Sequence, residues 1–597
     1  MRQAHKSSKI RGLAHLAGLY AVNRDGDFRI RPGRIRSRGG QRARPIIAQA
    51  LAAAQRAGGH ISRQGRVVAP GCSTFGRGRV ASVRATHRLG HRSRQVIVKA
   101  RVVRHGGRAS LAAHLNYLQR DGVTRDGERG VPFGAAADNL GRNEFAARCG
   151  DDRHHFRFIV SPEDADQMRD LKGFTRQLMT QMEKDLGTQL DWQAVEHWNT
   201  DNPHVHIIVR GVSEDGRDLV ISRDYIRDGM RAAAREIVTR ELGPRTDLDI
   251  RRSMERQVEA ERWTEIDRDL SRTMQRGGLI DMAPEPGVQP DGAHLLRVGR
   301  LRKLERLGLS HEIAPGQWTI ARDAQAALRK LGERDDIIKR MHKAMTGRGI
   351  DRGFASYVLD ADPTQPVIGR LVDRGLHDEL SGSAYAIVDG IDGRIHHIRF
   401  SDIEATGDCK PGAIVELRHF EDRKGRQRVA LAVRSDMDLS AQVHAPGATW
   451  LDRRNLSSDG RDLGGGFGSE VRAAMEARAE HLADEGLARR QGQRIIFARN
   501  LLDTLKRREL DAAAKELSVE IGLPHTPSKA GEYVAGTVRQ RITLASGRFA
   551  MIDDGLGFQL VPWSPSLDRQ MGKHISGVMR SNGGVDWSFG RGRGLGL

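Results

Sequence analysis

The chain contains few cysteines and no long apolar run. Its three cysteines, Cys72, Cys149 and Cys409, lie far apart among 597 residues, so they form neither a disulfide framework nor a CxxC zinc site. Few, widely spaced cysteines are typical of proteins in a reducing compartment. Because no stretch reaches the roughly 18 apolar residues that cross a bilayer, and the first residues lack a signal-peptide core, we expect a cytoplasmic protein without membrane insertion.

Acidic residues are almost missing from the first hundred residues. This segment holds 22 Lys and Arg but only Asp25 and Asp27, a net charge of +20, whereas the whole chain carries +22. Nearly all of these cations are arginines, which bind phosphate oxygens, and each neutralised phosphate releases counterions. We interpret residues 1–85 as a basic, largely disordered DNA-binding arm. The alternative is a solubilising tail without a specific target.

Residues 86–250 show the clearest alternation of strands and helices. Period-two patterns predict strands and spacings of three and four predict amphipathic helices, which together indicate an α+β fold, an antiparallel sheet with helices on one face. Strands are predicted at 96–103, 155–160, 191–196 and 204–210, and helices at 110–119, from Ser161 onward and at 222–242.

The second half of the chain is predicted to contain smaller modules. Val367-Ile-Gly369, followed by Ser381-Gly382 and Asp389-Gly390, resembles Val534-Ala-Gly536, followed by Ser546-Gly547 and Asp554-Gly555. Both segments are rich in short strands and glycine turns, which favours two related small β-barrels. We expect a helical linker and winged-helix-like module at 251–345, a β-barrel-like module at 350–445, and a helical stretch with a second such module at 446–597.

Three histidines lie in the segment His197-Trp-Asn-Thr-Asp-Asn-Pro-His-Val-His206. Alternate residues of a strand point to the same side, so His204 and His206 share a face while Val205 turns into the core. A short polar connection favours a hairpin that returns His197 to the same point. Three imidazoles with open coordination positions are typical of a catalytic metal site. The alternative is a set of solvated histidines.

The chemistry of the ligands narrows the choice of metal ion. Three neutral imidazoles suit Zn, Mn, Co or Ni better than Mg, but phosphate oxygens of a substrate would add hard ligands and favour Mg or Mn. We therefore expect a divalent metal that polarises a phosphate and neutralises transition-state charge. Asp201 lies between the histidines and is a candidate for orienting a ligand or for accepting a proton.

The histidine segment resembles the motif of relaxases, the HUH-type endonucleases that begin conjugative transfer of plasmids and integrated elements. In that family a His-hydrophobic-His pair and a histidine seven residues upstream hold the metal, which implies His197, His204 and His206 here. The family often has an acid two residues after the first histidine, where this chain has Asn199. Asp201 is present between the histidines, so the resemblance does not identify which residue acts as the general base.

The resemblance also implies a nucleophile. The family places a tyrosine near the start of the domain in a Tyr-Leu/Ile-x-Arg context, and Tyr117-Leu118-Gln119-Arg120 matches it. A phenol with a pKa of about 10 attacks poorly until a metal or base assists its deprotonation. A phosphotyrosine bond would keep the energy of the phosphodiester, so the strand could be rejoined. The alternative for Tyr117 is a core aromatic at a helix end.

Four further residues are candidates for contacting DNA. A serine after the strand that precedes the long helix is a family feature, and Ser161 matches it. A helix N-cap explains Ser161 equally well, and the two roles agree because helix N-termini bind phosphate. Arg120, Arg153 and Arg157 lie near these motifs and are suited to hold the DNA backbone.

The resemblance implies a relaxase with a long C-terminal domain of unassigned function. Such a protein nicks one strand at a transfer origin, forms a covalent 5′-phosphotyrosine intermediate and religates the strand. The implied partners are DNA, accessory DNA-binding proteins and the coupling protein of a type IV secretion channel, with export of the DNA-linked protein. The alternatives are an HUH replication initiator or transposase, which usually place their tyrosine after the histidines, and a decayed DNA-binding protein, suggested by Asn199.

Overall fold

The computed structural model divides the chain into two units, Met1–Ser73 and Thr74–Leu597. In the first unit the described residues form one antiparallel pair, β1 (His60–Ile61) with β2 (Val67–Val68). Most of the predicted basic arm at 1–85 therefore lies outside the described residues. These are 60–61, 67–68 and 77–588, without 87–89, 91, 105–107, 201, 284–286, 288, 360–365, 422–424, 426, 458–462, 493 and 582.

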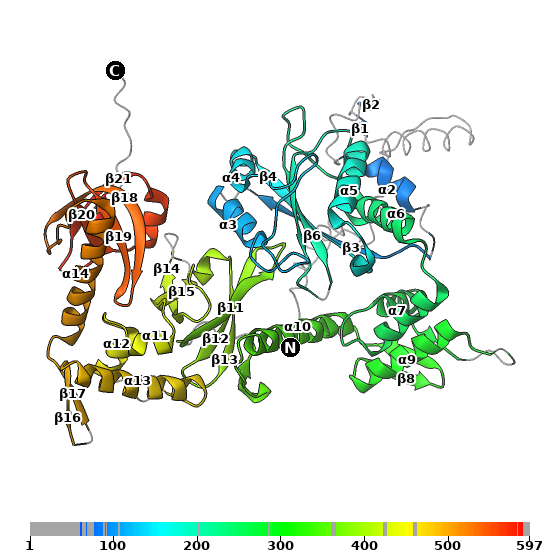
Figure 1. The fold of residues 1–597 in the computed structure, drawn as a ribbon. Helices are drawn as coiled ribbons and strands as arrows, with labels where there is room; N and C mark the ends of the chain where they lie inside the picture. The colour runs from blue at the N-terminus through cyan, green and yellow to red at the C-terminus, as the bar shows by residue number, and fades with distance from the viewer. Residues whose placement is uncertain are drawn as a thin grey trace, which may run out of the picture. The chain divides into compact units, whose positions relative to one another are not determined.

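A four-stranded sheet carries the three histidines. Its strand order is β3-β4-β6-β5, and each neighbouring pair is antiparallel. Figure 1 labels three of these strands, β3, β4 and β6. The alternating pattern that predicted these strands reflects a sheet that packs differently on its two faces. The strands are β3 (Val96–Arg104), β4 (His154–Pro162), β5 (Trp192–His197) and β6 (His204–Arg210).

One face of this sheet is apolar and is covered by α5 (Leu171–Leu186) and α6 (Met230–Leu242). Phe158 and Ile207 on the strands and Leu178 on α5 belong to one cluster of buried side chains. Removing this apolar surface from water is the main stabilising contribution to the layer. The result is the mixed α+β arrangement that the sequence predicted.

The opposite face carries the histidines and is partly covered by α3 (Arg108–Leu118) and α4 (Arg142–Arg148). Leu115 of α3 and Phe145 of α4 pack against Ile208 of β6 in a second buried cluster. Because residues two apart on a strand share a face, this contact places α3 on the histidine side of the sheet.

The start of the long helix differs from the prediction. A helix was expected from Ser161, but β4 continues through Pro162, which pairs with Val96. The neighbouring strand β3 extends far enough to pair with these residues, so the backbone stays extended. Helix α5 begins only at Leu171, where the carboxylate of Asp170 accepts a backbone N–H of the first turn.

Residues 247–346 form helices around a small three-stranded sheet of order β7-β9-β8. Leu301 and Trp318 lie in its buried core. The elements are α7 (Asp247–Glu259), α8 (Glu265–Gly277), β7 (Ile280–Asp281), α9 (Gly292–Arg306), β8 (Ser310–Ala314), β9 (Gln317–Ile320) and α10 (Ala324–Thr346).

A six-stranded sheet follows, with order β10-β13-β12-β11-β14-β15. Its pairs are antiparallel except β10 with β13. The strands are β10 (Tyr357–Val358), β11 (Ile368–Asp378), β12 (Ser383–Gly390), β13 (Ile395–Phe400), β14 (Ile414–Glu421) and β15 (Gln427–Ser435).

A second helical stretch then leads to a five-stranded antiparallel sheet of order β20-β19-β18-β21-β22. The helical stretch contains α11 (Leu439–Val443), α12 (Trp450–Leu456), α13 (Phe467–Asp484), the hairpin β16 (Ala488–Gln491) and β17 (Arg494–Phe497), and α14 (Leu501–Ile521). The sheet contains β18 (Tyr533–Leu544), β19 (Gly547–Asp553), β20 (Phe558–Pro562), β21 (His574–Met579) and β22 (Val585–Ser588).

The two larger sheets share a local arrangement at the glycines that the sequence comparison singled out. A Cβ on Gly369 would lie 2.2 Å from the carbonyl oxygen of Asp389, and a Cβ on Gly536 would lie 2.4 Å from that of Asp553. Only glycine permits such an approach. Both β11 and β18 also contain a bulge that begins two residues after this glycine.

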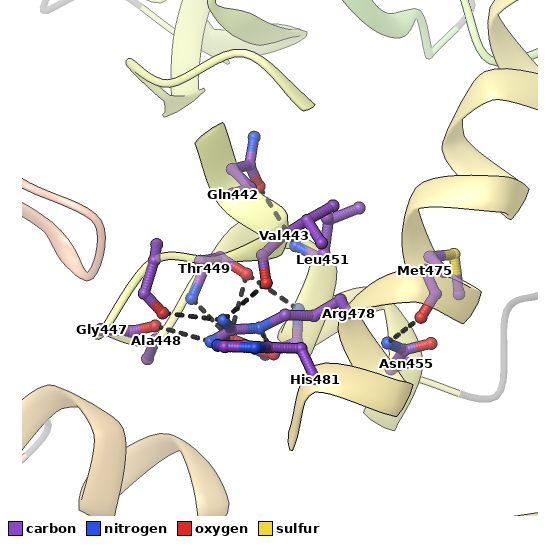
Figure 2. Close-up of polar contacts among 12 residues, drawn as sticks. Gln442, Val443, Gly447, Ala448, Thr449, Leu451, Asn455, Met475, Arg478 and His481 are labelled. Atoms are coloured by element: carbon purple, nitrogen blue, oxygen red, sulfur yellow. Dashed lines mark hydrogen bonds and ion pairs between the residues drawn. The ribbon is translucent and has the colours of Figure 1, made fainter. Parts of the chain in front are cut away.

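A buried arginine recurs in the helical parts that precede these sheets. Arg478 is fully buried and donates to both carboxylate oxygens of Asp452 and to three backbone carbonyls (Figure 2). Arg300 is equally buried and binds Asp267 in the same way. The carbonyls belong to Val443, Ala445 and Gly447 around Arg478, and to Val258, Ala260 and Arg262 around Arg300.

The surroundings of the two arginines match in spacing as well. Each aspartate completes a capping box with a threonine three residues earlier, Thr264 or Thr449, and the three carbonyls precede that threonine at the same intervals. Each arginine helix is followed by a short hairpin, a long helix and a sheet. These matches indicate two copies of one helix-and-sheet arrangement, which we call the first copy (residues 258–435) and the second copy (residues 443–588).

Candidate metal centre

The three histidines meet at one end of β5 and β6. His197 pairs with His204 across the two strands, and His206 lies two residues further along β6. Their ring centroids lie 4.4 to 5.5 Å apart. The side chains are almost fully buried, with exposed fractions of 0% for His197, 8% for His204 and 3% for His206. The hairpin that the sequence predicted therefore brings the histidines together.

A carboxylate from a distant part of the chain joins them. Glu379 lies in the turn between β11 and β12 of the first copy. Its Oε2 lies 3.4 Å from Nε2 of His204 and 3.2 Å from Nε2 of His206. The ligand atoms of the four residues all lie within 4.8 Å of one another. No sequence motif marks Glu379, and only the tertiary contact reveals it.

The nitrogen atoms of this group are arranged as metal ligands require. Nε2 of His197 donates to the carbonyl of Leu118 at 2.8 Å, while its buried Nδ1 has no hydrogen-bond partner among the described residues. Nδ1 of His204 lies 2.9 Å from the carbonyl of Asn202, so its Nε2 is the nitrogen that faces His206 and Glu379. A carbonyl that binds one ring nitrogen orients the other toward a metal.

The spacing of the ligand atoms also suits a single ion. Nε2 of His204 and Nε2 of His206 lie 3.1 Å apart, and the contacts of Glu379 are of similar length. Ligand atoms that share one metal at about 2.1 Å are separated by about 3.0 to 3.4 Å in tetrahedral or octahedral geometry. These residues therefore fit a divalent metal.

Burial favours the neutral forms of His197 and His206. Burial, together with the charges of the nearby His206 and Arg120, lowers the pKa of His197 to about 2. Burial likewise lowers the pKa of His206. For Glu379, burial alone would raise the pKa, but the charge interaction with His206 and hydrogen bonds with both histidines outweigh it and hold the pKa well below its ordinary value. Neutral imidazoles and an ionised carboxylate are the forms that bind metals.

Tyr117 occupies the last turn of α3 next to this centre. The residue after it, Leu118, supplies the carbonyl that holds His197. The guanidinium of Arg120 lies 4.3 Å from the centroid of the Tyr117 ring, and Arg120 also donates to the Tyr117 carbonyl at 3.3 Å. Burial raises the pKa of Tyr117, although Arg120 and a backbone hydrogen bond with Leu376 oppose this rise.

Three of the predicted DNA-contacting residues, Arg153, Arg157 and Ser161, lie on or directly beside β4. The Ser161 hydroxyl donates to the carbonyl of Pro203, directly before the histidine strand. Arg157 is buried on the histidine face, where its Nε donates to His155 at 3.1 Å and burial lowers its pKa to about 10. Arg153 precedes β4 at the opposite end and forms an exposed ion pair with Asp218 at 3.2 Å.

The acid–base candidate cannot be placed from the structure, because Asp201 lies outside the described residues. The backbone carbonyl of Asn199 accepts a hydrogen bond from Lys343 of α10 at 3.3 Å.

Further cations that the sequence did not single out lie along β3. Arg101 pairs with Arg157 and Lys99 with Ile159 in the register of the sheet, so both cations share the histidine face. Both are exposed. This exposed row beside a metal-ligand group is suited to bind a phosphate backbone.

A sheet that presents three histidines beside a tyrosine is an arrangement expected of a nuclease of the relaxase class. Residues 132–241 match the MobA/VirD2-like relaxase nuclease domain, and this range includes the three histidines. Residues 297–427 and 417–596, together half of the chain, match the family described as protein of unknown function (DUF3363). The chain therefore belongs to the relaxases of the HUH superfamily and carries a DUF3363 region after its nuclease domain.

The other comparisons add no relatives. Searches of curated proteins and of solved structures return no significant match. Tyr117 lies before the range matched by the nuclease model, so its assignment depends on its motif and on its contacts. Among the described residues, no helix combines the length and apolar character that crossing a bilayer requires.

Proposed function

We propose that this relaxase nicks one DNA strand at a transfer origin by transesterification, with Tyr117 as the nucleophile. The observation that carries the proposal is the hydrogen bond from His197 to the carbonyl of Leu118. This bond links α3, whose last turn holds the tyrosine, to the histidine group. An element that positions a nucleophile beside metal ligands supplies the orientation that a displacement at phosphorus needs.

The reaction exchanges one phosphodiester for another. The Tyr117 oxygen forms a bond to phosphorus as the bond between phosphorus and the 3′ oxygen breaks. The phenol loses its proton, and the leaving strand gains one as a 3′ hydroxyl. The 5′ phosphate stays on the tyrosine, so attack by a 3′ hydroxyl reverses the step and reseals the strand. A bound divalent metal would polarise the phosphate and stabilise its charge.

The surrounding residues have separate tasks. Arg120 stabilises the phenolate form of Tyr117 through its charge. His197, His204 and His206 hold the metal, for which Mg or Mn is favoured by the phosphate oxygens and Zn, Co or Ni by the imidazoles. Asp201 is the proposed proton acceptor. DNA-backbone contacts are assigned to Arg120, Arg153, Arg157, Ser161 and the β3 cations Lys99 and Arg101.

The cellular role follows from the proposed reaction. A nicked, protein-linked strand is the form in which conjugative DNA is transferred. The proposed partners are therefore accessory proteins that expose the origin and the coupling protein of a type IV secretion channel. The enzyme would act in the bacterial cytoplasm and leave the cell attached to the DNA.

A denaturing gel that detects protein–DNA adducts tests the nucleophile. The full chain is incubated with Mn²⁺ and a single-stranded oligonucleotide from its own element's origin. Wild-type protein is expected to form an adduct, and Tyr117→Phe is expected to form none. Tyr225→Phe is the matched control, because Tyr225 lies in the same domain but bonds to Asp185 in the helix layer. An adduct formed by Tyr117→Phe would refute the assignment, and free nicked ends without an adduct would indicate attack by water.

A further inference from the structure

The β11–β12 hairpin of the first copy, residues 373–384, reaches into the nuclease site. Its turn places the Glu379 carboxylate against His204 and His206. The carboxylate is mostly buried, with 22% of its side chain exposed. The Glu379 oxygen and one nitrogen atom from each of the three histidines lie within 4.8 Å of one another. The hairpin therefore contributes an oxygen ligand to the same centre as the histidines.

The same hairpin covers the tyrosine. Leu376 hydrogen-bonds Tyr117 through its backbone. A Cβ on Gly375 would lie 2.6 Å from the Tyr117 hydroxyl and 3.0 Å from the ring of Tyr385. A Cβ on Gly382 at the other side of the turn would lie 3.2 Å from the guanidinium of Arg157. The glycines thus allow the hairpin backbone to lie against the nucleophile and against a proposed phosphate ligand.

The corresponding hairpin of the second copy is built differently. Gly369 and Gly382 are 13 residues apart in the first copy, whereas Gly536 and Gly547 are 11 apart in the second. The first copy also has an additional bulge, between Leu376 and Asp378, directly before Glu379. The two extra residues thus fall on the hairpin that reaches the histidines.

The shorter hairpin of the second copy contacts its own helices. The backbone N–H groups of Ala545 and Ser546 donate to the Glu509 carboxylate, and the Ser546 hydroxyl accepts the N–H of Ala448. One copy therefore keeps its hairpin within the module, while the other extends it to the nuclease site.

A carboxylate at this position resembles the substrate chemically. Both a carboxylate and a phosphodiester present anionic oxygens to a divalent ion and to guanidinium groups. Glu379 lies against the histidines, and its hairpin lies against Tyr117 and Arg157. A scissile phosphate in the proposed reaction must contact the metal, the tyrosine and the nearby arginines, so the hairpin and the DNA need the same space.

We propose that Glu379 is a fourth, exchangeable ligand of the metal, delivered by the DUF3363 region and displaced by the DNA phosphate. Without DNA the hairpin retains the metal and shields Tyr117. When a phosphate oxygen replaces the carboxylate, the hairpin leaves and the nucleophile is exposed. The displacement rests on the proposed nicking function, whereas the binding of metal by Glu379 does not.

Calorimetric titration of the metal-free full chain with Mn²⁺ tests the ligand. Glu379→Gln keeps the size of the side chain but removes its charge, and it is expected to weaken Mn²⁺ binding by about 10-fold or more, the range found for groups that support a metal. The control is Glu421→Gln, because Glu421 is an exposed carboxylate at the end of β14 in the same sheet. Equal Mn²⁺ affinity in Glu379→Gln and wild type would refute the ligand.

Binding of a fluorescent single-stranded oligonucleotide at saturating Mn²⁺ tests the displacement. In a Tyr117→Phe background, which prevents turnover, Glu379→Gln is expected to bind DNA about 10-fold more tightly. Gly382→Ala strains the hairpin turn, where φ is +77°, and crowds the Arg157 guanidinium without changing a ligand, so it is expected to act in the same direction. Unchanged or weaker DNA binding in both variants would refute the displacement. If wild type forms no adduct but Glu379→Gln weakens Mn²⁺ binding, the proposed nicking function is refuted, whereas the assignment of Glu379 as a fourth metal ligand is supported.

Discussion

Replacing Arg478 by methionine would remove five hydrogen bonds from the core of the second copy (Figure 2). Both Arg478 and Asp452 are fully buried, so the variant would leave the aspartate without its cation. Breaking a buried pair in this way costs about 3 to 5 kcal/mol, and the three abandoned carbonyls add to this cost. We expect a loss of at least about 4 kcal/mol, close to the whole stability of a marginal domain.

Hydrogen exchange followed by mass spectrometry measures this loss locally. A change of 4 kcal/mol corresponds to about 1000-fold faster exchange in α11 and α12, whose helices surround the guanidinium. Arg490→Met is the matched control, because Arg490 forms an exposed pair with Glu480, and exposed pairs contribute at most about 1 kcal/mol. Acceleration of less than about 10-fold in Arg478→Met would refute the argument that the buried cluster stabilises the second copy.

Three further predictions concern the nuclease site and the first copy. His206→Ala should abolish the rise in melting temperature caused by Mn²⁺, whereas His419→Ala, at an exposed position, should retain it; a retained rise in His206→Ala would exclude the metal centre. Arg120→Gln should raise the pKa of Tyr117 and slow nicking about 10-fold at neutral pH, with the pH–rate profile moving to higher pH; an unmoved profile would contradict this role. Burial lowers the pKa of His397 to about 3, so below a pH of about 6.5 the unfolded chain binds a proton more readily than the folded chain. The free energy of unfolding is therefore expected to fall by about 2 kcal/mol from its value at higher pH by pH 5. Urea unfolding of His397→Phe should lack that fall, and an equal pH dependence of the unfolding free energy in both proteins would refute the prediction.

The nuclease sheet was largely predictable because its signals are local. The bounds of β6 are those expected from the pattern of His204–Arg210, and the helix predicted at 110–119 appears as α3 with small shifts. The helix predicted at 222–242 appears as a π-helical turn at Tyr225–Gly229 that continues into α6 (Met230–Leu242). The error at Ser161 has a tertiary cause. A serine followed by proline is a good helix start by itself, but β3 supplies hydrogen-bonding partners that keep this segment extended.

The short glycine similarity in the second half indicated a repeat but not its extent. The equivalence of Arg300 and Arg478 depends on backbone carbonyls, and any residue can offer a carbonyl. Sequence therefore shows only the threonine and aspartate of each capping box. The contact between each arginine and its aspartate, which joins separate helices, appears only in the folded chain.

The alternation along a strand is enough to place His204 and His206 on one face, and the family motif is enough to add His197 and Tyr117. These inferences need only neighbours in sequence, because strand geometry relates nearby residues by a constant period. Glu379 obeys no such relation. It reaches the histidines because a hairpin two residues longer than its counterpart lies on another domain's sheet, and such a long-range contact depends on packing that no local pattern encodes.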